Sequence, residues 1–463
     1  MRKVNVLING GLEVAYADAM TVPLSTFIYN KKGGDTVTSF YVPKGREVKV
    51  IKFPRNRNKF ERFCVDADEV NYIDKRVAGE FISFDLKDTF KLRDYQKEPV
   101  AGVLKDLTAT RDNATVLQAE PSFGKTFILP YIVSSLQKRT LVLVDRDLLR
   151  DQMYEEFTDN STAIVEKLSS KTTKLGDVNI ATFQLLLKNK RLMKLLAKEI
   201  GFIIVDECHV APADKFLKVI SALPAKYRLG LSATPTRSDG LTSIITDTFG
   251  YNKVIGANPN NLKVYNVVVE TKIPVFFANK SEYAKQFVKA MTSPIKKGAD
   301  TPIQLAVAAG IKLRQRNRKV LVYVTYGKLQ ELVKKGFEAE GYSVAIIQGK
   351  TPKVKRAELI QAFQEGKIDI LVSGVILQKG VSIHALDTII NLAPQNKENL
   401  EQVKGRLRRE LEGKGEPMFI YFTFGGKLEY SNATTVQLLA DSQNKGDKFA
   451  RVSVNGFKKQ LGV

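Results

Sequence analysis

Short aliphatic runs alternate with helix-like stretches from about residue 91 to residue 425, and this alternation restricts the fold more than any other feature. The runs are four or five residues long, which fits parallel strands covered on both faces. They are Thr115–Gln118, Leu141–Val144, Phe202–Val205, Arg228–Leu231, Val320–Val324, Ser343–Ile347, Asp369–Val372, Thr388–Asn391 and Met418–Phe422. Between them, Phe183–Lys198, Leu329–Glu340 and Lys353–Glu365 predict helices. The pattern predicts an α/β protein with two tandem parallel sheets.

The first 90 residues have a different character, with turn signals rich in glycine, asparagine and lysine between short strand-like segments. Glycine, asparagine and proline gather again at residues 250–265, which we expect to join the two α/β parts. We therefore predict three domains: a small β-rich accessory domain over 1–90, a first lobe over 91–257 and a second lobe over 258–463.

Basic residues are dense between Lys44 and Arg62, where eight lysines and arginines are interleaved with Phe53 and Phe60. Such a hairpin could follow a phosphate backbone and stack on bases. It could equally be a hairpin with a solvated outer face and phenylalanines in its core. Both interpretations stay open.

Charge points to a polyanionic partner. The 463 residues include 72 lysines and arginines against 49 acidic residues, and residues 258–463 carry +15 of the net +23. This surplus favours nucleic acid, although a surface adapted for solubility would give the same count. Two cysteines are too few for a disulfide framework, and with only two histidines a four-ligand zinc site of cysteine and histidine has almost nothing to be built from. No apolar run approaches about 18 residues, so we expect no membrane span, no secretory signal and a cytoplasmic protein.

The segment from Ala119 to Thr126, Ala-Glu-Pro-Ser-Phe-Gly-Lys-Thr, follows a predicted strand and precedes a predicted helix. A loop in this position can present backbone N–H groups and a helix N-terminus to phosphates. Lys125 would reach the β- and γ-phosphates, and Thr126 would hold Mg²⁺. Ala119 and Ser122 replace glycines of the standard pattern, which alters the loop but leaves its backbone donors.

Two adjacent carboxylates, Asp206 and Glu207, end another apolar strand and are followed by Cys208 and His209. Burying such a pair is costly without a cation or a shared proton. Mg²⁺ held through Asp206, with Glu207 polarising a water for attack on the γ-phosphate, would explain the pair. A solvated acidic turn is the alternative for this motif alone. Together with the phosphate loop, the pair predicts a nucleotide hydrolase.

The ordered set of motifs resembles the superfamily 2 helicases over roughly residues 91–425. Asp-Glu-Cys-His at 206–209, Leu-Ser-Ala-Thr-Pro at 231–235 and Gln-Val-Lys-Gly-Arg-Leu-Arg-Arg at 402–409 are similar to the second, third and sixth motifs of that family. Leu-Arg-Asp-Tyr-Gln at 92–96 resembles the element that recognises adenine. Residues 236–240 resemble the DNA-directed branch, especially bacteriophage branch-migration helicases. The resemblance implies two RecA-like lobes.

Roles for individual residues follow from the same resemblance. The implied nucleotide contacts are Arg93, Gln96, Ser122, Gly124, Lys125 and Thr126, with Mg²⁺ held by Thr126 and Asp206. The implied catalytic residues are Lys125, Asp206, Glu207, Gln402, Arg406 and Arg409, and Arg409 is our first choice for an arginine finger. The implied nucleic-acid contacts are Arg146, Thr182, Gln184, Gly349, Ser373 and Gly374. His209, Ser232 and Thr234 would couple nucleotide state to motion. Two simpler interpretations stay open. The arginines could form the solvated face of a helix, and His209 could be a residue of the core.

These features predict a monomeric, ATP-dependent DNA helicase or translocase that unwinds or branch-migrates DNA in replication, recombination or repair. One alternative is an RNA helicase. Another is a nucleic-acid-stimulated ATPase that clamps its partner without processive unwinding.

Overall fold

The computed structural model divides into two compact units, Met1–Ala257 and Asn258–Val463, which are described separately here. The described residues are 3–9, 12–15, 28–30, 36–38, 50–53, 60–61, 69–120, 123–209, 213–233, 235, 242–258, 262–269, 280–295, 299–374, 383, 385–393, 397–408, 414–424 and 447–462.

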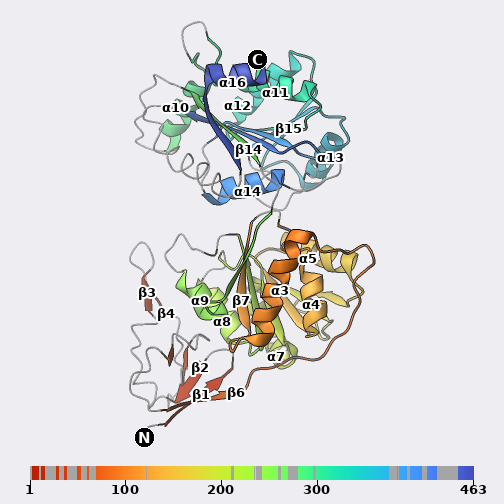
Figure 1. Cartoon of the computed structure of the whole chain (residues 1–463), viewed down its shortest axis with the longest axis vertical. Coiled ribbons are helices and arrows are strands. Elements are labelled where there is room, and N and C mark those ends of the chain that lie inside the picture. The colour runs from red at the N-terminus through yellow and green to blue at the C-terminus, as the bar shows by residue number, and fades with distance from the viewer. Residues whose placement is uncertain are drawn as a thin grey trace. The chain divides into compact units, whose positions relative to one another are not determined.

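Seven parallel strands form the main sheet of the first unit, in the order β13-β7-β12-β11-β8-β10-β9. Figure 1 shows this sheet at the strand labelled β7. In chain order they are β7 (Ala114–Ala119), β8 (Thr140–Val144), β9 (Val165–Lys167), β10 (Val178–Thr182), β11 (Phe202–Val205), β12 (Tyr227–Ser232) and β13 (Lys253–Gly256). Strands β8, β10 and β11 are buried along their whole length. Because the strands are parallel, their carboxyl ends lie at the same edge of the sheet. This edge is where ligands bind in open α/β sheets.

Helices cover both faces of this sheet because successive strand residues point to opposite sides. Leu141 and Leu143 of β8 contribute to one core, whereas Val142 and Val144 contribute to the other. Helices α3 (Asp94–Ala109), α4 (Leu129–Leu136) and α5 (Asp147–Asn160) pack on the Val142 side. Helices α6 (Phe183–Lys188), α7 (Lys190–Glu199), α8 (Ala213–Ser221) and α9 (Ser243–Phe249) pack on the Leu141 side.

A smaller sheet precedes this layer, in the order β5-β2-β1-β6. Its strands are β1 (Lys3–Ile8), β2 (Leu12–Ala15), β5 (Val50–Phe53) and β6 (Glu69–Asp74), and β3 (Ile28–Asn30) pairs separately with β4 (Thr36–Thr38). After β6 the chain runs along the first unit through isolated bridges at Val77, Phe81 and Leu86. Of the basic segment predicted between Lys44 and Arg62, only β5 and residues 60–61 are described. Its predicted hairpin therefore lies largely outside the described residues.

The second unit also contains seven parallel strands, in the order β16-β17-β15-β18-β19-β14-β20. In chain order they are β14 (Lys263–Val269), β15 (Val320–Tyr323), β16 (Val344–Ile347), β17 (Ile370–Ser373), β18 (Thr388–Asn391), β19 (Met418–Phe424) and β20 (Lys448–Ser453). Strand β14 lies between β19 and β20, so segments far apart in the sequence are hydrogen-bonded side by side.

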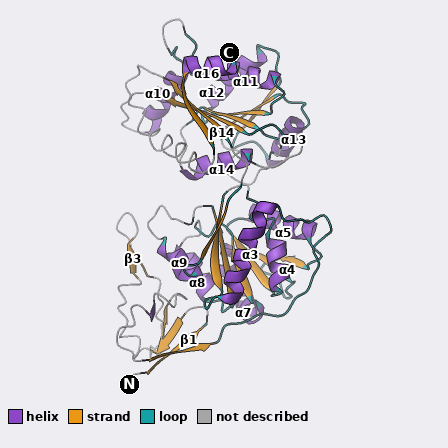
Figure 2. Ribbon diagram, viewed as in Figure 1, coloured by secondary structure: helices purple, strands orange, loops and turns teal. Residues whose placement is uncertain are grey.

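Helices again flank both faces, as Figure 2 shows for each unit. Helices α10 (Lys280–Thr292), α11 (Pro302–Gln315), α12 (Gly327–Glu338) and α16 (Val454–Leu461) share one core with Val320 and Val322. Helices α13 (Lys353–Gln364) and α14 (Lys397–Leu407) share the other with Leu321 and Tyr323. Two tandem α/β units with parallel sheets confirm the predicted fold class. None of the helices described is long and apolar enough to cross a membrane.

Two local predictions differ from the structure. The single helix expected over Phe183–Lys198 is two helices, because Asn189 ends α6 and begins α7. The Asn189 side chain accepts a hydrogen bond from the Leu192 amide at 3.0 Å, which caps the second helix. The segment 250–265, expected only as a joint, contains β13 and the start of β14. Gly250 follows the last residue of α9, and Gly256 is the last residue of β13.

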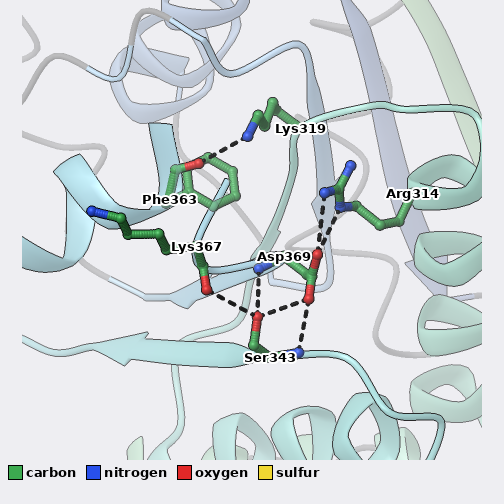
Figure 3. A network of polar contacts seen from close by, with 6 residues as sticks. All are labelled: Arg314, Lys319, Ser343, Phe363, Lys367 and Asp369. Carbon is green, nitrogen blue, oxygen red and sulfur yellow. Dashed lines mark hydrogen bonds and ion pairs between the residues drawn. The ribbon is translucent and has the colours of Figure 1, made fainter. Parts of the chain in front are cut away.

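A polar network fixes the amino ends of β16 and β17 in the second unit (Figure 3). One carboxylate oxygen of Asp369 accepts hydrogen bonds from Nε and Nη2 of Arg314 at 3.2 and 3.1 Å. The other accepts from the Ser343 amide at 3.0 Å and the Ser343 hydroxyl at 2.7 Å. Nearby, Nζ of Lys319 donates to the Phe363 carbonyl at 3.0 Å. The network joins α11 to two strand starts.

We expect Asp369→Asn to destabilise the second unit by about 1–3 kcal/mol at neutral pH, because charge-assisted hydrogen bonds are lost. Burial alone would raise the pKa of Asp369, but hydrogen bonds from Ser343 and the charge of Arg314 outweigh it and lower the pKa. The stabilisation is therefore complete above the ordinary carboxyl pKa and is lost as pH falls through the lowered value. Denaturant unfolding at pH 7 and at about pH 3 should show a smaller difference between wild type and variant at pH 3 than at pH 7.

Glu365→Gln is the matched control, because its ion pair with Lys367 is exposed. It should leave the unfolding midpoint unchanged at both pH values. Equal effects from the two variants would contradict the role given to the Asp369 network.

Candidate functional site

The predicted phosphate loop begins where β7 ends. Nζ of Lys125 donates a hydrogen bond to the Ala119 carbonyl at 2.8 Å, so the lysine folds across the loop toward the last residue of the strand. Gly124 has φ of +85°, a left-handed conformation that favours glycine. Thr126 is half-buried in the turn that leads into α4, and Ser122 lies outside the described residues. The strand, loop and helix order that the motif requires is present.

The element predicted to recognise adenine lies against this loop. The Gln96 side chain is fully buried; its amide Nε2 donates to the Phe123 carbonyl at 2.6 Å and its Oε1 accepts from the Arg93 amide at 3.0 Å. A Cβ atom placed on Gly124 would lie 2.7 Å from Nε2 of Gln96 and 3.4 Å from Nη1 of Arg93. Gln96 therefore supports the loop, and its predicted contact with adenine stays a prediction.

The paired carboxylates follow β11 at the same edge of the sheet. Burial first, and the charge of Glu207 second, raise the pKa of Asp206 well above its usual range, and the ammonium group of Lys125 opposes them. The charge of Lys125 therefore acts on the end of β11, so the loop and the paired carboxylates lie at the same edge of the sheet. The donor set fits Mg²⁺, which proteins commonly hold through one or two carboxylates together with substrate phosphates.

Glu207 has two unusual features. Its φ is +44°, a left-handed conformation that is strained for a residue with a side chain. Its Oε2 atom is buried and makes no hydrogen bond within the described structure. Strained backbone and an unsatisfied buried acceptor are typical of residues held in place for a reaction.

His209 connects this edge to the end of β12. Its Nδ1 atom lies 2.8 Å from the Ser232 hydroxyl and 3.4 Å from Oε2 of Glu207. The structure thus places two of the three predicted coupling residues in direct contact. Thr234, the third, lies outside the described residues.

The nucleic-acid contacts predicted in the first unit gather around Asp145, directly after β8. Nε of Arg146 lies 3.3 Å from one Asp145 oxygen, and Nε2 of Gln184 lies 3.5 Å from the other. The Thr182 hydroxyl accepts from the Leu185 amide and caps α6. Arg146 is half exposed, whereas Thr182 is almost buried. The three residues therefore share one end of the sheet.

The contacts predicted in the second unit differ in exposure. A Cβ on Gly349 would meet no atom within 4 Å, so its backbone is open. Ser373 is fully buried and donates its hydroxyl to the Ile347 carbonyl at 3.0 Å. A Cβ on Gly374 would lie 2.6 Å from the Val324 carbonyl, so this glycine allows close backbone packing. The geometry gives Ser373 and Gly374 internal roles and leaves their nucleic-acid contacts as predictions.

The predicted catalytic arginines belong to α14 and the residues after it. Val403 and Leu407 are buried, whereas Arg406 is half-buried. The backbone of Gln402 lies within α14, but its side chain and the whole of Arg409 lie outside the described residues.

Comparison with known proteins assigns the family. Residues 89–237 match the model described as "Type III restriction enzyme, res subunit", and residues 303–410 match the "Helicase conserved C-terminal domain". A protein named probable helicase D10, from Escherichia phage T5, is 26% identical over 363 residues, which cover 77% of this chain and 76% of D10. The chain belongs to the superfamily 2 helicases. It is therefore an ATP-dependent enzyme that acts on nucleic acid.

Two further similarities agree with this helicase assignment. The DNA 3'-5' translocase XPB2 of Sulfurisphaera tokodaii is 22% identical over 389 residues, which cover 74% of this chain and 84% of XPB2. The structure of S. cerevisiae Dbp5 bound to RNA and ADP BeF3 superposes with a TM-score of 0.53 at 15% identity, over 81% of this chain and 97% of Dbp5. At that identity the likeness shows the fold alone.

Two features of the helicase site were missed from the sequence. One is the use of Gln96, in the first turn of α3, to hold the loop; the sequence offered only its place in the Leu-Arg-Asp-Tyr-Gln element. The other is Asp145, which contacts two predicted nucleic-acid residues. Its contact with Gln184 could not be predicted, because Gln184 comes from a different strand–helix junction.

Proposed function

We propose that this helicase hydrolyses ATP at the loop of the first unit and uses the energy to move along DNA, which it unwinds or branch-migrates. The observation that carries the proposal is the convergence of Lys125, Asp206 and Glu207 at the carboxyl ends of β7 and β11. Gln96 and Gly124 support the same loop. Replication, recombination and repair are the processes in which such movement is used.

The chemistry assigned to these residues follows from their groups. Lys125 binds the β- and γ-phosphates, exchanging its contact with the Ala119 carbonyl for them. Thr126 and Asp206 would hold Mg²⁺, which supplies charge neutralisation on the phosphates when bound. Glu207 orients and deprotonates the attacking water through its buried carboxylate. The raised pKa of Asp206 reflects a carboxylate that a neighbouring cation would stabilise.

The second unit completes the reaction in this proposal. Arg406 and Arg409 are three residues apart, and they would stabilise charge on the γ-phosphate in the transition state, with Gln402 beside it. Such arginines would make hydrolysis depend on the second unit as well as on the first. The pair His209 and Ser232 would transmit nucleotide state from Glu207 toward the nucleic-acid side.

DNA is the proposed track for two reasons. XPB2, a relative that matches most of this chain, is named a DNA 3'-5' translocase. The second unit also carries most of the net positive charge, +15 of +23, which favours contact with phosphates and a steep loss of affinity with salt. Arg146, Gln184 and Gly349 are the proposed backbone contacts. We further propose that residues 1–90 form an accessory domain and that the helicase acts as a monomer.

A substrate panel tests this function. ATP hydrolysis is measured with single-stranded DNA, forked DNA, four-way junctions and RNA at equal nucleotide concentration, and strand displacement is measured on the same substrates. We expect DNA to stimulate hydrolysis and forks or junctions to be opened. Stronger stimulation by RNA would identify an RNA helicase. Stimulated hydrolysis without displacement would identify a clamp.

We expect Ser232→Ala to reduce strand displacement by about five- to fiftyfold while ATP hydrolysis changes little, because coupling energies of this kind are modest. The variant removes the hydroxyl that contacts His209. Both rates are measured on one preparation, with Ser134→Ala as control because its hydroxyl donates to Tyr131 inside α4. Parallel losses of both rates would assign Ser232 to hydrolysis itself.

A further inference from the structure

Three charged side chains are buried together in the second unit. Nη2 of Arg408 lies 2.6 Å from Oδ1 of Asp447, and Nζ of Lys404 lies 3.4 Å from its Oδ2. The exposed fractions of the three side chains are 4% or less. Lys404 belongs to α14 and Arg408 follows its last residue. One carboxylate therefore holds the cations of both Lys404 and Arg408.

Asp447 also connects the helix to the sheet. Its Oδ1 atom accepts a hydrogen bond from the Leu262 amide at 3.0 Å, and the Lys448 amide donates to the Leu262 carbonyl at 3.0 Å. Leu262 precedes β14 and Asp447 precedes β20. The Asp447 carboxylate therefore links α14 to the starts of two adjacent strands, β14 and β20.

The geometry of an α-helix gives this attachment a consequence for Arg406. Residues two positions apart on a helix point about 200° apart, so Lys404 and Arg408 lie on the side away from Arg406. Leu400, Val403 and Leu407 pack into the core with Phe419 and Tyr421 of β19. Asp447 adds a directional contact to this non-directional packing, and so restricts rotation and sliding of α14.

Stability alone is a weak reason for such a cluster, because buried ion pairs seldom stabilise more than apolar residues of the same volume. A directional buried carboxylate can instead specify one arrangement of the helix. We propose that Asp447 is a positioning residue for ATP hydrolysis: it holds Lys404 and Arg408 so that α14 presents Arg406 correctly. The proposal rests on the function proposed for α14 above.

The test compares Asp447→Asn with wild type and with Asp369→Asn in the full chain. Asp369 is also paired with an arginine in the second unit, but at the amino ends of β16 and β17. ATP hydrolysis with saturating DNA is measured at a temperature well below the unfolding midpoint of every variant. We expect Asp447→Asn to lower kcat about tenfold to a hundredfold, with KM for ATP within about twofold. Asp369→Asn should lower the unfolding midpoint but leave kcat unchanged.

Two further variants keep the test decisive if Asp447→Asn folds poorly. Arg408→Lys retains the charge and loses the planar fork, so it should lower kcat by a smaller factor at unchanged KM. Lys404→Met combined with Asp447→Asn restores the net charge of the cluster and retains a carbonyl acceptor for Arg408, so it should recover part of kcat.

The outcomes separate the two proposals. Wild-type kcat in Asp447→Asn and Arg408→Lys would overturn the positioning role and leave the helicase function intact. An increase in the KM for ATP with kcat unchanged would also overturn it. So would an equal loss of kcat in Asp369→Asn. Absence of DNA-stimulated hydrolysis in the wild type would overturn both proposals.

Discussion

Replacement of Glu207 by glutamine is expected to lower ATP turnover by roughly 10²–10⁴-fold while nucleotide binding persists. Glutamine keeps the size of the side chain but cannot accept a proton from water. The carboxylate that it removes has a buried, unsatisfied Oε2 atom beside His209, in a backbone of φ +44°. Steady-state hydrolysis gives the turnover, and fluorescence titration with a nucleotide analogue gives the binding.

Lys125→Ala and Glu199→Gln complete this experiment. Lys125→Ala should lose turnover together with nucleotide affinity, because the ammonium group contacts the phosphates in the ground state. Glu199 forms an ion pair with Arg139 and lies just before β11, at the end of that strand opposite to Asp206. The Glu199→Gln variant should therefore hydrolyse ATP at the wild-type rate. Near-normal turnover in Glu207→Gln would remove Glu207 from the catalytic role.

Arg409→Ala is expected to abolish the DNA-stimulated part of hydrolysis, a loss of about 10³-fold, with ATP binding retained. An arginine that contacts the γ-phosphate only in the transition state contributes to kcat and little to substrate affinity. Arg406→Ala should behave in the same way, because it belongs to the same helix end. The measurement is kcat and KM for ATP with and without single-stranded DNA.

Arg451→Ala provides the control for the loss of an arginine from the second unit. Arg451 lies in β20, where its backbone pairs with Asn266, and its side chain is exposed. It should retain full stimulation by DNA. If Arg409→Ala also retained stimulation, the finger role would have to pass to Arg406 or to another cation.

Strands in the two sheets were the easiest elements to predict. Buried parallel strands have to be apolar on both faces, so Leu141–Val144 and Phe202–Val205 stood out without any partner being known. Edge strands lack this signal, because one side of the strand meets solvent. In strand β13 only Gly256 is buried, and in β20 no residue is buried and half of the residues are polar. Neither could be distinguished from a linker or a tail.

The site was predictable where chemistry and chain order coincide. Lys125 and Asp206 follow strands, and the carboxyl ends of parallel strands share one edge, so their proximity followed from the fold class. The contacts of Gln96, Asp145 and Asp447 were not predictable, because each joins segments whose spatial register only the packed structure determines. The contact of Ser373 was not predictable either. This residue lies at the end of a strand, but its hydroxyl donates to the Ile347 carbonyl inside the protein.

Strand order in the second unit has a consequence for biosynthesis. Strand β14 emerges from the ribosome early, yet its two neighbours, β19 and β20, follow about 150 and 180 residues later. Until residue 424 has been made, both edges of β14 stay unpaired, and the edge that pairs with β20 stays open to association with other chains until residue 453. Chaperone dependence and slow maturation should therefore be confined to the second half of the nascent chain, whereas the first unit can fold during translation.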